Sequence, residues 1–159
     1  MKFYIFRHAE KSSGGGPNPS LSAGGFDQAS KLALLVREGK LPSPQELWVS
    51  PKIRTHQTFA PLAEHLGISL KEIPELIEKQ SSESLPEFRQ RIESVLQEVV
   101  ATKKCIFVCT HMDWAEEAMS LIPCDKDLSG SEFSYWSPAQ YVGFQLDKSL
   151  FHFLETGAV

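Results

Sequence analysis

Three apolar segments of the chain are each followed by arginine or histidine. Arg7 and His8 follow the first segment, Arg54 follows the second and His111 follows the third. An arginine guanidinium is a planar set of donors that matches the oxygens of a phosphate group two at a time. Two arginines and two histidines that meet in one crevice would therefore form a pocket for a phosphate-like dianion.

A histidine in such a pocket can also act as a nucleophile. Neutral imidazole can attack phosphorus and form a phosphohistidine. Nearby arginine charges disfavour protonation of the ring and keep it neutral near pH 7. The other histidine, if charged, would stabilise the transferring oxygens, and a carboxylic acid would protonate the leaving oxygen and later activate water. Because the cationic side chains neutralise the phosphoryl charge, we expect no metal and no cofactor.

The elements that must position these residues alternate between strand and helix. Buried strands are predicted over Lys2–Phe6, Glu46–Ser50 and Cys105–Cys109. Helices are predicted from Ser22 to about Glu38, from Pro51 to Gly67, from a Ser84–Glu87 capping box onward and over Ala115–Leu121. A hairpin is predicted where Tyr141–Leu146 and Leu150–Leu154 flank Asp147-Lys148-Ser149.

This alternation indicates an α/β fold with a mainly parallel sheet. In the first helix, the predicted inward face carries Phe26, Ala29, Ala33 and Val36. In such sheets ligands bind beyond the carboxyl ends of the strands, which is where the arginines and histidines stand. Arg54 would also lie in the first turn of its helix, where free N–H groups favour an anion.

Four segments of the chain resemble those of a known family. They are Arg7-His8-Ala9-Glu10, Asn18-Pro19-Ser20-Leu21-Ser22 with Gly25, Gln28 and Ala29, Ser50-Pro51 with Arg54-Thr55 and Gln57-Thr58, and Ile106–His111. In type, spacing and order they are similar to the histidine phosphatase superfamily, the phosphoglycerate-mutase-like proteins. The resemblance covers nearly the whole chain.

The resemblance implies a fold and a set of roles. The fold would be a three-layer α/β/α sandwich, with residues 1–159 as a single histidine phosphatase domain. His8 would be the phosphorylated nucleophile, and Arg7, Arg54 and His111 would hold the phosphoryl group. The implied activity is that of a metal-independent phosphatase, with a phosphohistidine protein or a small phosphomonoester as substrate.

The proton donor is less clearly marked. Leu76-Ile77-Glu78 matches the L-x-E that many members carry, but the G-x-W-E-G segment that follows in them is missing. Glu78 is the candidate, and Glu75, Glu83 and Asp113 are competitors. The small size also resembles the short bacterial phosphohistidine phosphatases, which lack long lid insertions and often lack that acid.

Other polar and aromatic residues have less specific interpretations. Asn18 could bind the phosphoryl group or cap a turn. Tyr135 and Trp136 could form a substrate rim or, as the favoured alternative, pack over the core. The remaining histidines, His56, His65 and His152, are expected on polar faces.

Composition narrows the class of protein. The chain has 159 residues, 42% hydrophobic and 23% charged, which is typical of one globular domain. With a net charge of -4 and no long apolar run, we expect neither nucleic acid nor membrane as partner. The three cysteines match no disulfide or metal template, and the first residues do not form a secretory signal. A cytoplasmic protein with reduced thiols is expected.

Two other functions fit the same residues. A non-catalytic module that binds phosphate or a phosphoprotein would keep the pocket without turnover. A phosphoglycerate-type mutase is disfavoured because the chain is short and lacks lid segments that would retain an intermediate. A redox or metal protein has little support, because no metal-ligand spacing is present.

Overall fold

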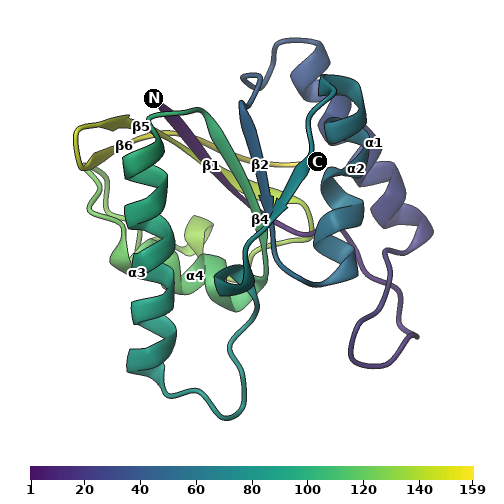
Figure 1. The fold of residues 1–159 in the computed structure, drawn as a ribbon, viewed down its shortest axis with the longest axis horizontal. Helices are drawn as coiled ribbons and strands as arrows, with labels where there is room; N and C mark the ends of the chain where they lie inside the picture. Colours follow the sequence, from purple (N-terminus) through teal and green to yellow (C-terminus); the bar gives the residue numbers. More distant parts are fainter.

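A sheet of six strands runs through the molecule in the order β3-β2-β4-β1-β5-β6. The computed structural model describes all residues 1–159, and Figure 1 shows the sheet between two layers of helices. The strands are β1 (Lys2–Arg7), β2 (Glu46–Val49), β3 (Leu70–Glu72), β4 (Ile106–Thr110), β5 (Gln140–Asp147) and β6 (Leu150–Ala158). Strands β1 to β4 are parallel, and β5 and β6 run antiparallel at one edge. The predicted α/β fold with a mainly parallel sheet is confirmed.

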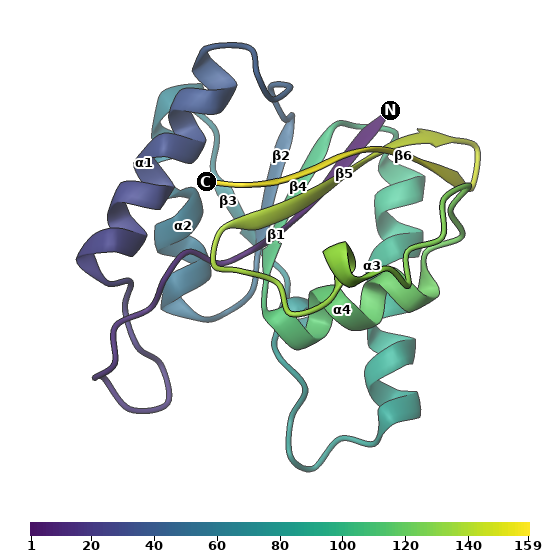
Figure 2. The ribbon, with the colours of Figure 1, turned by 180° about the vertical axis from the view of Figure 1, so that it is seen from behind.

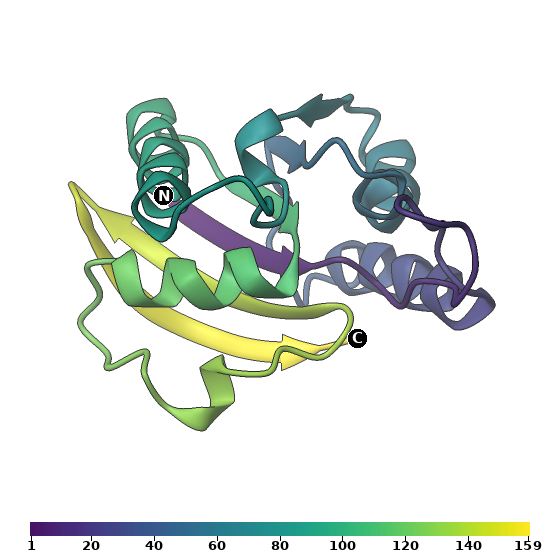
Figure 3. The ribbon, with the colours of Figure 1, turned by 90° about the horizontal axis from the view of Figure 1, so that it is seen from below.

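Two helices cover each face of the sheet, which gives the three-layer sandwich. Helices α1 (Ala23–Arg37) and α2 (Ile53–Leu66) lie on one face, and α3 (Leu85–Thr102) and α4 (Met112–Leu121) lie on the other (Figures 1 and 3). Two short 3-10 turns, η1 (Pro74–Leu76) and η2 (Ser131–Phe133), complete the elements. None of the helices combines the length and the apolar character needed to cross a membrane.

The central strand β1 is buried from both sides. Phe3 and Ile5 pack into the core that α3 and α4 cover, whereas Tyr4 and Phe6 pack into the core beneath α1 and α2. Successive side chains of a strand point to opposite faces, so an unbroken apolar run fits a strand that is covered on both faces. The apolar runs that precede the predicted site residues are therefore the strands that hold them.

Local signals set several helix ends as predicted. Ser22 caps α1, where its hydroxyl accepts the Gly25 N–H at 3.0 Å. Ser84 and Glu87 form the predicted capping box of α3. Gly67 ends α2 in the left-handed conformation with φ 65°, which is the usual role of glycine after a helix.

Two helix starts differ from the prediction. Helix α2 begins at Ile53, two residues after Pro51, because the Asn18 side chain accepts the Ile53 N–H at 3.1 Å. Helix α4 begins at Met112, three residues before the predicted Ala115. Its first turn carries Asp113, whose carboxylate accepts N–H groups in that turn and from the neighbouring loop. Contacts from distant segments set both starts.

Phe26 was predicted on the inward face of α1, and this is wrong. Its side chain is 46% exposed, whereas Gly25, Ala29 and Leu32 point inward. The backbone of α1 approaches the carbonyl of Glu10 so closely at Gly25 that this residue sets the buried stripe. Phe26, one position further on, is turned toward solvent.

The C-terminal hairpin is longer than the alternation predicted. Strands β5 and β6 extend over Gln140–Asp147 and Leu150–Ala158, joined by Lys148 and Ser149. Lys148 has φ 56°, the left-handed conformation that a tight turn requires. Figure 2 shows the hairpin along the β1 side of the sheet.

The carboxyl ends of β1, β2 and β4 meet at one edge of the sheet. Arg7 of β1 is level with Thr110 of β4, and Val49 of β2 is level with Cys109. In Figure 1 this edge faces downward, and the loops that follow β1 and η1 extend from it. The same edge therefore carries all of the predicted site residues.

Gly25 should tolerate no side chain. A Cβ there would lie 2.0 Å from the Glu10 carbonyl oxygen, whereas a Cβ at Gly24 meets only the end of the flexible Glu10 side chain at 3.3 Å. We expect Gly25→Ala to destabilise the fold by about 2 kcal/mol through overpacking. Gly24→Ala, the matched control, should be neutral or stabilising by up to about 1 kcal/mol. Urea unfolding of both variants measures the difference, and equal stabilities would contradict the close approach.

Candidate active site

The sheet edge brings the four predicted phosphate ligands together. Arg7 ends β1 and His8 follows it, Arg54 is the second residue of α2, and His111 lies between β4 and α4. The rings of His8 and His111 have centroids 5.4 Å apart. A guanidinium nitrogen of Arg54 lies 3.1 Å from Nδ1 of His111. Both histidines and Arg54 are buried.

The backbone of His8 is held from both sides. Its N–H donates to the Thr110 carbonyl at 3.0 Å, and its carbonyl accepts the Ala139 N–H at 3.1 Å. The next N–H, of Ala9, donates to the Thr58 hydroxyl of α2 at 2.9 Å. Strand β4, helix α2 and the segment before β5 thus fix the turn that presents the imidazole.

The tautomer of His8 follows from its one hydrogen bond. Nδ1 lies 2.7 Å from the Ala9 carbonyl oxygen, which can only accept. Nδ1 therefore carries the proton, and in the neutral ring the lone pair is on Nε2. An imidazole oriented in this way is prepared for nucleophilic attack through Nε2.

The surroundings keep His8 uncharged. Burial is the main cause that lowers the pKa of His8 to about 4, and the charges of Arg54, Arg7 and Lys11 lower it further. The hydrogen bond to Ala9 opposes this shift in part. The imidazole is therefore neutral near pH 7, as the sequence-based argument requires.

His111 is oriented by two neighbours. Arg54 donates to Nδ1, so the ring proton is on Nε2, which lies 2.8 Å from the Ser50 hydroxyl. Burial, followed by the charge of Arg54, lowers the pKa of His111 far below its usual range. His111 is thus a neutral N–H donor, and not the charged ring considered from the sequence.

The two arginines have hydrogen-bonding capacity to spare. Arg7 donates one terminal N–H to the Trp136 carbonyl. Nε of Arg7 and both Nε and the second terminal nitrogen of Arg54 are buried without a hydrogen-bond partner in the protein. Buried donors without partners are rare and costly. Guanidinium donors beside a neutral imidazole fit the oxygens of a bound oxyanion.

Glu78 lies within this cluster. One carboxylate oxygen is 3.3 Å from Arg54 and 3.5 Å from Lys52, and the other is 3.2 Å from Nε2 of His111. The side chain is 27% exposed. The carboxylate thus lies between the histidine and arginine cluster and Lys52.

The competing carboxylates are placed differently. Glu83 forms a two-point ion pair with Arg91, and Asp113 accepts N–H groups at the start of α4. Glu75 is exposed and only its backbone carbonyl makes contacts. Of the four carboxylates considered from the sequence, Glu78 is the one that touches the histidine and arginine cluster.

Asn18 contacts the start of the helix that carries Arg54. Its side-chain oxygen accepts the Ile53 N–H, so the loop before α1 is tied to the start of α2. Gln57 strengthens this tie, because its side-chain oxygen accepts from Ser20 and Leu21 at 3.0 and 2.8 Å. The family-like segments of the loop therefore make structural contacts.

Sequence reasoning did not single out three participants. Ser50 orients His111, Lys52 lies beside Glu78, and the Trp136 carbonyl holds Arg7. Ser50 could have been found, because it opens the segment that resembles the family and follows a buried strand. A backbone carbonyl 129 residues away from Arg7 leaves no sequence signal. Trp136 itself is buried in the core, as the favoured alternative had it, but this alternative is wrong for Tyr135, whose side chain is 88% exposed.

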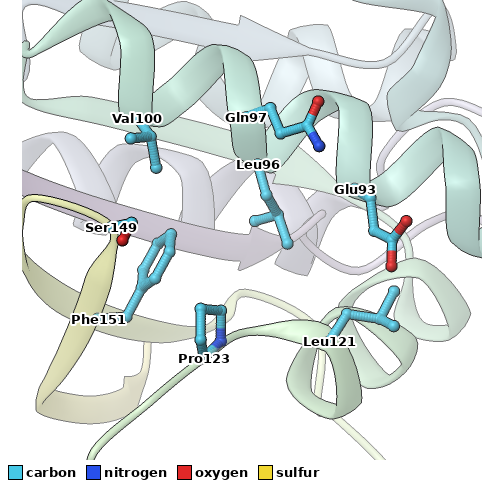
Figure 4. A pocket seen from close by; sticks show the side chains of 8 residues that line it. All are labelled: Glu93, Leu96, Gln97, Val100, Leu121, Pro123, Ser149 and Phe151. Atoms are coloured by element: carbon cyan, nitrogen blue, oxygen red, sulfur yellow. The ribbon is translucent and has the colours of Figure 1, made fainter.

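An apolar pocket lies in another part of the molecule. It has a volume of about 470 Å³ and lies between α3, the end of α4 and the start of β6, with Leu96, Val100, Leu121 and Phe151 among its lining residues (Figure 4). None of the histidine and arginine cluster lines it. The candidate site is thus a set of convergent polar groups at the sheet edge.

A protein-family model matches the part of the chain that holds most of the site residues. The model of the histidine phosphatase superfamily, branch 1, matches residues 3–81, a range that includes Arg7, His8, Arg54 and Glu78. His111 lies beyond it. No curated protein matches the sequence.

Solved structures share the fold over nearly the whole chain. The protein histidine phosphatase SixA in complex with tungstate is 18% identical with a TM-score of 0.77, and the match covers 99% of this chain and 97% of that one. A phosphoserine phosphatase from Entamoeba histolytica is 12% identical with a TM-score of 0.75, covering 98% and 95%. A protein of Escherichia coli K-12, described as an α-ribazole-5′-P phosphatase, is 15% identical with a TM-score of 0.80, covering 97% and 95%.

The matched segment and the shared fold agree. The chain belongs to the histidine phosphatase superfamily, and it resembles the short branch that contains SixA. The three-layer, phosphoglycerate-mutase-like fold is confirmed as well.

The imidazole of His8 should remain neutral well below the pH at which free histidine titrates. In ¹⁵N NMR spectra of the ring we expect Nδ1 to be protonated and Nε2 to be unprotonated at pH 7. This state should persist as the pH falls toward the pKa of about 4. In urea-denatured protein the same ring should titrate near its ordinary pKa of about 6.5. Protonation of native His8 near pH 6.5 would contradict the assigned environment.

The same shift predicts how stability depends on pH. Because the native pKa of His8 is depressed, the unfolded chain binds the proton first as the pH falls below 6.5. The free energy of unfolding should therefore decrease between pH 6.5 and about 4, with His111 acting in the same direction. His8→Asn should make this part of the profile shallower.

Proposed function

We propose that the protein is a metal-independent phosphatase that works through a phosphohistidine on His8. The observation that carries the proposal is the state of the site. His8 has its Nε2 lone pair free, and three guanidinium nitrogens of Arg7 and Arg54 have no protein partner. Such an arrangement matches a nucleophile beside donors for a phosphoryl group.

The first step transfers the phosphoryl group to the enzyme. The Nε2 lone pair of His8 attacks phosphorus, and the bond to the leaving group breaks with its electron pair. Arg7, Arg54 and the His111 N–H stabilise charge on the phosphoryl oxygens. The Ala9 carbonyl, which accepts from Nδ1, stabilises the positive charge that develops on the ring. The Glu78 carboxylate takes up a proton from solvent and passes it to the leaving oxygen.

The second step releases phosphate. Water attacks the phosphorus of phosphohistidine and the P–N bond breaks, so that its electron pair returns to Nε2. The proton of the attacking water passes to the Glu78 carboxylate and from there to solvent, which restores the ion-paired carboxylate. Cationic side chains supply the charge neutralisation in both steps, and for this reason we assign no metal role.

The substrate class we favour is a phosphohistidine protein, with small phosphomonoesters as the second class. SixA, which shares the fold, is described as a protein histidine phosphatase, and the relative from Entamoeba histolytica as a phosphoserine phosphatase. Glu78 faces Arg54 and Lys52 as an ion-paired carboxylate. A phosphohistidine leaving group needs less help from an acid than an alkoxide does, which fits this pairing.

The proposal also places the protein in the cytoplasm. Its three cysteines are free, and Cys109 is buried in the core. Free thiols are typical of proteins in a reducing compartment.

Labelling should locate the phosphoryl group on His8. On incubation with radiolabelled phosphoramidate and rapid quenching in alkali, we expect a base-stable, acid-labile label on His8 of the wild type. His8→Ala should take no label and should lose about a thousandfold or more in turnover. The exposed His65→Ala is the matched control, and a chelator should change neither result. Phosphate binding without label or turnover would instead indicate the non-catalytic module.

The effect of replacing Glu78 on turnover should depend on the leaving group of the substrate. Glu78→Gln should lower turnover of an alkyl phosphate by about a hundredfold, because general acid catalysis contributes on that scale. Turnover of a phosphohistidine protein should change only a few-fold. Glu75→Gln, a neighbouring exposed carboxylate without side-chain contacts, is the control. An equal loss on both substrates would exclude the assigned proton transfer.

A further inference from the structure

The Glu78 carboxylate lies against two of the groups that the proposed function assigns to the phosphoryl oxygens. One of its oxygens is 3.3 Å from Arg54 and the other is 3.2 Å from Nε2 of His111. A carboxylate presents two oxygens on one planar group, much as one face of a phosphoryl group does. The Arg54 terminal nitrogen that faces Glu78 donates to this carboxylate and to Nδ1 of His111, so it is not free for a second anion while Glu78 stays in place.

Only one of the two Glu78 carboxylate oxygens accepts a hydrogen bond in this position. The oxygen that faces His111 is buried and has no hydrogen bond, since its contact with Nε2 lacks hydrogen-bond geometry. The Nε2 proton of His111 is closer to Ser50, at 2.8 Å. A buried acceptor without a donor is costly, so moving Glu78 outward costs less than breaking a satisfied pair.

The backbone of Glu78 is fixed, so the side chain is the part that can move. Arg91 donates to the carbonyls of Glu75 and Ile77 at 2.6 and 2.7 Å and is paired with Glu83. These contacts hold the segment that follows η1 against α3. Rotation about the side-chain bonds of Glu78 is then the available motion.

Lys52 lies on the side toward which the Glu78 side chain can rotate. Its ammonium is 3.5 Å from Glu78 and also donates to the Pro17 carbonyl at 3.3 Å, at the edge of the pocket. Its side chain is 21% exposed. Glu78 can keep its pairing with Lys52 while it leaves Arg54 and His111.

We propose that Glu78 is an internal competitor for the phosphoryl site: in the resting enzyme its carboxylate is paired with Arg54 and lies against His111, and the incoming phosphoryl group displaces it toward Lys52. The inference rests on the proposed function, since it takes Arg54 and His111 as phosphoryl ligands. Two consequences follow. Inorganic phosphate, the product, binds weakly because it must displace the carboxylate. Glu78 reaches a position for proton transfer only after a phosphoryl group is bound.

Binding of inorganic phosphate tests the displacement without any turnover. By isothermal titration calorimetry at pH 7, Glu78→Gln should bind phosphate about tenfold more tightly than the wild type, since a hydrogen bond to a charged group is no longer lost. Glu75→Gln removes the same charge from a neighbouring exposed position and should leave the affinity unchanged. Thermal unfolding of each variant verifies that it is folded.

Glu78→Asp separates displacement from simple charge repulsion. It keeps the negative charge but withdraws the carboxylate by about 1.5 Å, the length of one carbon–carbon bond. If Glu78 competes for the ligands, Asp should also bind phosphate more tightly than the wild type. If repulsion alone acts, Asp should match the wild type while Gln binds more tightly, and this result would overturn the inference. Unchanged affinity in all variants would overturn it as well.

The labelling of His8 keeps the two proposals apart. Label on His8 together with unchanged phosphate affinity would refute only the internal competitor. Tighter phosphate binding by the Gln and Asp variants without label on His8 would refute only the catalytic proposal.

Discussion

Parallel pairing of β1 with β4 is the constraint on which the site depends. It sets Arg7 level with Thr110 and lets the His8 N–H bond to the Thr110 carbonyl, so His8 and His111 emerge side by side. Strand β2, paired with β4 on its other side, brings the start of α2 and therefore Arg54 to the same edge. Buried apolar strands cannot shift register without exposing their side chains, and this makes the placement rigid.

A cluster of buried cations is costly, and the surrounding structure offsets the cost. Both histidines are neutral. Arg7 donates a hydrogen bond to the Trp136 carbonyl, and Arg54 donates hydrogen bonds to Glu78 and to the His111 ring. What remains unsatisfied is a set of guanidinium donors. Buried donors without partners lower the stability of the fold, and such a loss of stability is common at functional sites.

Much of the fold and of the candidate site could be predicted from the sequence, because the arginines and histidines of the site follow directly after apolar strands or begin the next helix. The apolar run before Arg7 and the capping signals at Ser22 and Ser84 are local, and they indicated both the α/β fold and the shared edge. Tertiary contacts left no such signal. Asn18 sets the start of α2 from 35 residues away, and the short strand β3 depends on pairing with β2. The position of Glu78 depends on the Arg91 anchor, which no spacing in the sequence indicates.

The central claim is that Nε2 of His8 attacks phosphorus within a cradle of guanidinium groups. A crystal structure with orthovanadate tests it most directly. We predict vanadium bonded to Nε2 of His8, its oxygens contacting Arg7, Arg54 and the His111 N–H, and Nδ1 still donating to the Ala9 carbonyl. Vanadate bound elsewhere, or held by the arginines with Nε2 turned away from the metal, would contradict the account.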